Sequence, residues 1–190
     1  TGNDTTGDGT SGNPWATPSK ALEWLDNKFI TADATVTIQC ADGHYTDLTQ
    51  LYIMHPNASN IEIMGENTYD VTMSSIQSSS GSTGAWSIVL NISDVSNISE
   101  NDYILVAADV SGGTRPDIMA GCWKVTNVDV GNTRITVTNT SRYTSAPSGA
   151  VSGDVKVIKT IFNFASGEHG VFINNGGRLG NLGKVVLVSG

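Results

Sequence analysis

The stretch Thr35-Val36-Thr37-Ile38-Gln39-Cys40 alternates polar and apolar residues, and further short apolar runs follow at Leu51–Met54 and Ile61–Met64. Alternation with a period of two is typical of a strand that buries one face. Val36 and Ile61 lie 25 positions apart, which is too far for a hairpin and too short for an ordinary strand–helix–strand unit. We therefore expect short strands that return at a regular interval, as in the coils of a parallel β-solenoid.

The residues before this stretch predict a short amphipathic helix. Thr17 is a suitable N-cap, and Pro18 is tolerated at the first helical position because its missing N–H would have no partner there. Leu22, Leu25 and Phe29 then fall on one face. A first coil without a cover would expose its apolar interior and its unpaired strand edges. We expect the helix to cover that end.

The low-complexity segment Ser78–Gly84 indicates a boundary, after which short strands are joined by tight turns. Val125–Val130 and Thr133–Thr138 flank Gly131-Asn132 and predict an antiparallel hairpin. From Thr160 the spaced apolar runs return. The expected organisation is a lead-in loop and capping helix over 1–34, first coils over 35–80, an inserted antiparallel β subdomain over 81–159, and resumed, truncated coils over 160–190.

Composition restricts the function classes. The 190 residues are 38% hydrophobic and include 21 glycines, which favours an all-β chain rich in turns. A formal net charge of −8 argues against a nucleic-acid partner, and no apolar run approaches membrane-spanning length. The sequence starts without Met or a signal peptide, so we expect an excerpt of a longer protein. Cys40 and Cys122 are expected to be free thiols, with a bridge as the alternative.

The N-terminal motifs resemble a known family. Gly2-Asn3-Asp4, Asp8-Gly9, Asn13-Pro14-Trp15-Ala16-Thr17 and Ala41-Asp42-Gly43 with Tyr45 occur in an order similar to the opening of pectin-lyase-like β-helices of bacteriophage tail fibres and tailspikes. The resemblance implies an all-β fold: the first coils of a right-handed parallel β-helix, an N-terminal capping helix and an inserted antiparallel β subdomain. It also implies a homotrimer in the extracellular virion tail. The implied partners are host cell-surface polysaccharide and other virion tail proteins, without nucleic acid or membrane insertion.

Catalytic chemistry finds little support in the residue pattern. Hydrolysis of a polysaccharide needs two carboxyl groups that face each other across a groove, and no pair of acidic residues has a spacing that places it so. The Asp4–Gly9 loop departs from the ligand spacing of a calcium site. We expect no catalytic residue, no metal and no cofactor in this chain, and we lean against enzymatic activity. The acidic candidates considered are Asp42, Asp47, Glu62, Asp117 and Glu168.

Binding is the favoured interpretation. Glycan sites combine aromatic faces with Asn, Asp and Arg groups that bond to hydroxyls. Two long polar loops, Gly112–Asp117 and Ser141–Ser148, are suitable places for recognition residues. Trp123 alternates with Val125 and also fits a core position. The candidate binding residues are Arg115, Asp117, Trp123, Arg142 and Tyr143.

The predicted function is host-surface glycan attachment by a phage tail fibre or tailspike component, or its structural support. One alternative is a polysaccharide-degrading tailspike, a lyase or hydrolase whose groove lies beyond this chain. The other alternative is a secreted solenoid adhesin.

Overall fold

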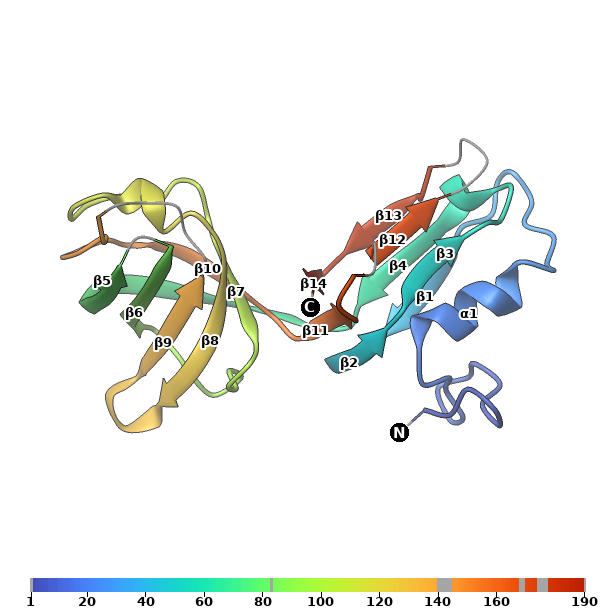
Figure 1. Cartoon of the computed structure of the whole chain (residues 1–190), viewed down its shortest axis with the longest axis horizontal. Helices are drawn as coiled ribbons and strands as arrows, with labels where there is room; N and C mark the ends of the chain where they lie inside the picture. Colours follow the sequence, from blue (N-terminus) through green and yellow to red (C-terminus); the bar gives the residue numbers. More distant parts are fainter. Residues whose placement is uncertain (1, 83, 140–144, 168–169, 174–177, 190) are drawn as a thin grey trace. The chain divides into compact units, whose positions relative to one another are not determined.

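The computed structural model describes residues 2–82, 84–139, 145–167, 170–173 and 178–189. The chain divides into two compact units, one made of residues 1–67 with 159–190 and the other of residues 68–158. Strands dominate both units, and the described residues contain one α-helix. We call them the parallel-sheet unit and the barrel unit, and each is described by itself (Figure 1).

The parallel-sheet unit contains three small sheets in which every strand pair is parallel. Val36 is paired with Ile61, so the predicted spacing corresponds to a register of neighbouring strands. The sheets have the orders β1-β4-β13, β14-β11-β2 and β12-β3. Their strands are β1 (Val36–Cys40), β2 (Gly43–Leu48), β3 (Gln50–Ile53), β4 (Ile61–Gly65), β11 (Thr160–Phe164), β12 (Gly170–Ile173), β13 (Asn181–Gly183) and β14 (Val185–Ser189).

Alternation along these strands builds a core within the unit. Ile61 and Ile63 on β4 are fully buried, as are Leu51 and Phe162. The rings of Tyr45 and Phe162 meet edge to face with centroids 5.4 Å apart, a favourable arrangement for aromatic quadrupoles. Burial alternates along β4, whereas β3 and β11 bury consecutive residues, so the period of two accounts for part of this core.

Helix α1 (Pro18–Leu25) packs against β3 and β1. The Thr17 hydroxyl oxygen accepts a hydrogen bond from the Lys20 amide, so Thr17 is the N-cap, as predicted. Leu22 and Leu25 are buried in the core of the unit. Phe29 lies beyond the end of the helix and is 89% exposed. The prediction that Phe29 shares the buried helical face was wrong, because the helix ends before its next turn.

Side chains of the turn after β3 bind the segment that follows α1. The Asn60 amide nitrogen donates to the carbonyls of Thr31, Ala32 and Ala34 at 3.3, 2.9 and 2.6 Å. His55 is buried, and its Nε2 lies 2.8 Å from the Lys28 carbonyl oxygen. These contacts give hydrogen-bond partners to backbone carbonyls that are not paired within a sheet.

Within the parallel-sheet unit, one turn binds the two residues that flank the barrel unit in the sequence. The Asp42 carboxylate accepts hydrogen bonds from the backbone and side-chain N–H groups of Asn67, the last residue before the barrel. The amide of Gly43 donates to the carbonyl of Lys159, the first residue after it, at 2.9 Å. Asp42, one of the acidic candidates, thus binds the residue that precedes the barrel unit, and the neighbouring Gly43 binds the residue that follows it.

The barrel unit is a closed sheet of six antiparallel strands in the order β10-β5-β6-β9-β8-β7. Closure comes from β10, which pairs with β5 on one side and β7 on the other, so that Ile158 lies opposite both Thr68 and Tyr103. The strands are β5 (Thr68–Ser82), β6 (Ala85–Ile92), β7 (Tyr103–Val106), β8 (Gly121–Asp129), β9 (Arg134–Asn139) and β10 (Gly153–Ile158).

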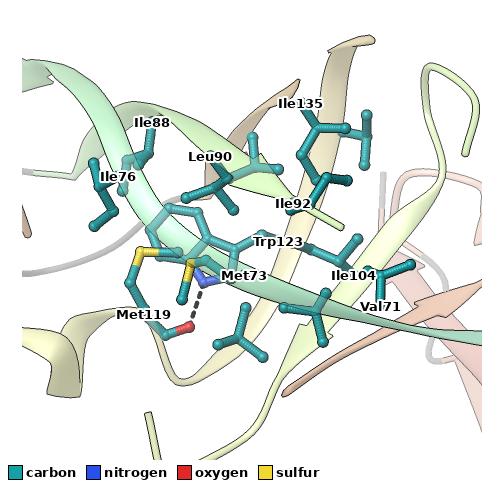
Figure 2. Packing of buried hydrophobic residues seen from close by; sticks show 14 of the residues in the cluster. Val71, Met73, Ile76, Ile88, Leu90, Ile92, Ile104, Met119, Trp123 and Ile135 are labelled. Atoms are coloured by element: carbon teal, nitrogen blue, oxygen red, sulfur yellow. Dashed lines mark hydrogen bonds between the residues drawn. The ribbon is translucent and has the colours of Figure 1, made fainter. Parts of the chain in front are cut away.

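The barrel interior is an apolar core (Figure 2). Trp123 is its largest fully buried side chain, and it packs among residues from several strands, including Met73, Leu90 and Ile135. Its indole Nε1–H donates to the carbonyl oxygen of Met119 at 2.8 Å. The buried donor is therefore satisfied, as a large aromatic side chain in a core requires.

The predicted fold class needs correction. We expected a right-handed parallel β-helix as the defining fold, with a capping helix and a subordinate antiparallel insertion. The closed sheet among the described residues is instead an antiparallel barrel, and the parallel strands form separate sheets of two or three strands. A local spacing of 25 residues is satisfied by pairing between neighbouring parallel strands. This spacing does not determine which strands of the chain form a closed sheet.

Candidate ligand-binding site on the barrel

Two polar loops of the barrel unit lie against each other. The Thr114 amide donates to the Ser148 carbonyl at 2.8 Å, and the Ser148 amide returns a bond to Thr114 at 3.1 Å. Ser111 and Ser152 exchange a second pair of backbone bonds at 3.0 and 2.9 Å. We name the described residues 111–117 and 145–152 the loop platform. These bonds join the two loops that the sequence had marked separately.

Glycines allow the close approach of the two loops. Gly112 and Gly113 both have positive φ angles, of 79° and 58°, a region that glycine adopts without steric cost. A Cβ atom at Gly112 would collide with the Ala150 carbonyl oxygen, and one at Gly113 with that of Ser148. The platform is therefore a tightly joined surface.

Arg115 connects both loops through its side chain. Its Nε and Nη2 donate to the two carboxylate oxygens of Asp117 at 3.1 Å each, and its Nη1 donates to the Ser145 hydroxyl at 3.2 Å. Its backbone is left-handed, with φ 55° and ψ 52°. A non-glycine residue in this region carries strain, and such strain is concentrated at functional sites.

The ion pair faces solvent and remains charged at neutral pH. The side chains of Arg115 and Asp117 are 42% and 60% exposed. The hydrogen bonds from Arg115 hold the pKa of Asp117 below its ordinary value, with a smaller contribution from the guanidinium charge. A bidentate Arg–carboxylate pair fixes the planes of both groups. The platform thus presents an oriented carboxylate beside the hydroxyl of Ser145.

Trp123 lies below the platform and not on it. It is completely buried, which makes direct contact with a ligand impossible in this structure. Its bond to Met119 holds the residue that follows the short 3₁₀ helix Pro116–Ile118, and that helix follows Arg115 directly. Its inclusion among the ligand-contacting candidates is corrected to a supporting core position, which its alternation with Val125 had also indicated.

The remaining candidates have other places. Arg142 and Tyr143 lie outside the described residues, as does Glu168. Asp4 accepts bonds from the amides of Ala16 and Thr17, so its carboxylate organises the N-terminal loop. Within the described ranges, no three His, Cys, Asp or Glu side chains are grouped so that they could hold a metal.

The sequence did not single out Ser145. Serine is common in loops, and its partnership with Arg115 across 30 positions has no local signal.

Comparison with known proteins gives no family. No family model and no curated protein matches the chain. Among solved structures, a siderophore-interacting protein from Acinetobacter baumannii is matched with 16% identity over 66% of this chain and 67% of that chain, at a TM-score of 0.31. This similarity is too low to assign a fold or a ligand.

These findings correct the identity that the N-terminal resemblance implied. No family model and no curated protein of that kind matches the chain, and the closed sheet is an antiparallel barrel instead of a parallel β-helix. The predictions of a phage tail fibre or tailspike, of host-surface attachment or its support, of a degrading tailspike or solenoid adhesin, and of a virion location were wrong. A glycine-rich opening followed by a capped helix is compatible with more than one fold, because it records local turn and capping chemistry.

The structure does not test the predicted homotrimer or the polysaccharide and other protein partners, and these stay predictions. Nucleic acid and membrane insertion were expected to be absent, and they are likewise untested. Across the described ranges, the chain has no helix with the length and apolarity needed to cross a membrane.

Proposed function

We propose that the barrel unit is a recognition module whose loop platform binds a hydroxyl-rich ligand of the saccharide class. The observation that carries the proposal is the Arg115–Asp117 ion pair, which is exposed and hydrogen-bonded to a hydroxyl from the second loop. Saccharides present both donors and acceptors at short spacing. A carboxylate beside a serine hydroxyl offers complementary groups.

Preorganisation supports the same proposal. The backbone bonds between Thr114 and Ser148 and the close packing at Gly113 hold the two loops together before a ligand arrives. Ordering a loop during binding costs free energy, so a platform that is already joined loses less. The left-handed backbone of Arg115 also places its side chain at a conformational cost that the surrounding contacts maintain.

The experiment is a glycan array followed by titration calorimetry on the best binder. We expect Arg115→Ala to weaken binding by about tenfold or more, because loss of one charged hydrogen-bonding group costs roughly 1.5–3 kcal/mol. Lys156→Ala is the matched control, since Lys156 forms an exposed ion pair with Asp70 elsewhere on the barrel. Equal affinity of the wild type and Arg115→Ala, or absence of any glycan binding, would reject the proposal.

A further inference from the structure

We propose that Asp117 sets the charge selectivity of the loop platform, so that it accepts neutral ligands and excludes anionic ones such as sulfate, phosphate or uronate groups. The inference rests on the proposed function for its saccharide ligand. The exclusion of anions, however, can be tested without a saccharide.

The geometry shows how Asp117 occupies the anion-binding side of Arg115. A guanidinium recognises an oxyanion through two parallel N–H donors. In Arg115 the Nε and Nη2 donors point at the two oxygens of Asp117, so this edge is already occupied by a carboxylate within the chain. An external sulfate would have to displace Asp117 or approach its negative charge.

The same arrangement leaves capacity for hydroxyl groups. Each carboxylate oxygen has two acceptor sites, and each Asp117 oxygen accepts one bond from Arg115. The Ser145 hydroxyl oxygen accepts from Arg115, and a hydroxyl group also has one hydrogen of its own to donate. A neutral polyol can therefore donate to Asp117 and accept from Ser145 without placing two negative charges together.

The charge of the barrel unit adds to the discrimination. Residues 68–158 contain eight Asp or Glu and five Lys or Arg, a formal net charge of −3. Across the described residues of this unit, Asp117 is the acidic group that bonds both donors of the Arg115 edge. Replacing it with asparagine keeps the shape of the side chain and removes the charge. The substitution isolates the electrostatic part of the arrangement.

The test is titration of ¹⁵N-labelled full chain with sodium sulfate, following the amides of the loop platform by NMR. We expect Asp117→Asn to bind sulfate at these residues with a dissociation constant at least about tenfold lower than that of the wild type. Asp70→Asn is the control, because it leaves Lys156 without its carboxylate partner on the same barrel and should cause no shifts in the platform. The double variant Arg115→Ala/Asp117→Asn should lose the gained site.

Each outcome decides the matter. Sulfate binding by the wild type at the platform with the affinity of Asp117→Asn would overturn the inference, and so would no binding by either. Preference of the wild type for acidic over neutral members of a glycan array would overturn it while leaving the proposed recognition function standing. Absence of all glycan binding, with the sulfate gain intact, would reject the proposed function and leave Asp117 as an anion-excluding residue.

Discussion

The two units of this protein satisfy their backbones in different ways. In the barrel unit every sheet neighbour is antiparallel, and the closed order leaves no strand at an edge. The parallel-sheet unit has edge strands in each of its small sheets. Closure removes unpaired edge groups altogether, whereas an open sheet needs other partners for them.

In the parallel-sheet unit, side chains supply hydrogen-bond partners for some of the backbone groups that are not paired in a closed sheet. Asn60 and His55 bond to carbonyls of the segment after α1, and Asp42 bonds to Asn67. In the barrel, Arg134 Nε donates to the side-chain oxygen of Asn91, and the Asn91 amide donates to the Ser75 hydroxyl, so these polar side chains bond to one another. The comparison teaches that stability in one unit depends on the apolar interior of a closed sheet, while the other also depends on amide-to-backbone contacts.

The largest expected effect is on the barrel core. Trp123→Ala removes a fully buried indole and its bond to Met119 and should cost about 3–5 kcal/mol. Because each unit has its own core, hydrogen exchange measured by mass spectrometry should show the loss of protection in residues 68–158. Trp123→Phe serves as the control, since it keeps an aromatic ring of smaller size. Equal loss of protection in both units would contradict their independence.

A comparable effect is expected for the helix of the parallel-sheet unit. Leu25 is buried in the core on α1, and Leu25→Asp should cost roughly 3–4 kcal/mol because it buries a charge without a partner. Leu105→Asp is the matched control on β7, where the leucine is 44% exposed, and should change stability by less than about 1 kcal/mol. Urea unfolding measures both. An unchanged midpoint for Leu25→Asp would show that the helix contributes nothing to this unit.

An intermediate effect should separate two half-buried asparagines. Asn60→Ala leaves three carbonyls without their donor and should cost about 1–3 kcal/mol. Asn91→Ala should cost less, about 0.5–1.5 kcal/mol, because its partners Ser75 and Arg134 are side chains that can turn to water. Urea unfolding with matched m-values tests the order. A larger loss for Asn91→Ala would reverse the comparison between the units.

The smallest effect is expected at alkaline pH. Burial raises the pKa of Cys40 from 9.0 to about 12. The unfolded chain therefore loses this proton from about pH 9 upward while the folded chain keeps it, so the contribution is complete below pH 9 and falls as pH rises toward 12. At pH 10 the loss is about 1 kcal/mol.

Cys40→Ala should flatten the fall in stability between pH 8 and 10, whatever its effect on the absolute value. Cys122 provides the comparison: the residue as a whole is exposed, and partial desolvation of its thiol raises its pKa in the same direction. Cys122→Ala should flatten the slope less. Urea titrations at several pH values measure both slopes. An identical pH slope for wild type and Cys40→Ala would show that Cys40 ionises with equal ease in the folded chain.

Local features of the fold could be predicted from the sequence. Thr17 and Pro18 define the start of α1 through capping chemistry. The hairpin of β8 and β9 is confirmed, with Asp129 paired to Arg134 across the turn that contains Gly131 and Asn132. Both depend on residues close in sequence, where propensity and turn chemistry act directly.

The long-range strand pairing of the barrel could not be predicted. Barrel closure pairs Ile158 with Thr68 and Tyr103, and no local pattern carries that register. The serine-rich segment predicted as a boundary is in fact the end of β5, where Gly81 pairs with Trp86. Its backbone pairs regardless of its small polar side chains. The loop platform could be predicted only in part, for the same reason. Its two loops were recognised in the sequence, but the backbone hydrogen bonds between them and the bond from Arg115 to Ser145 were not.

The turn at Asp42 and Gly43 has a consequence for how such a chain can change over generations. It holds both Asn67 and Lys159, and the barrel strands that join them begin and end as paired neighbours, Thr68 opposite Ile158. A gene segment that encodes residues 68–158 can therefore be gained, lost or exchanged as one cassette, because the flanking chain needs only a short connection at this turn. The loop platform can therefore diverge in sequence while the parallel-sheet unit keeps its own.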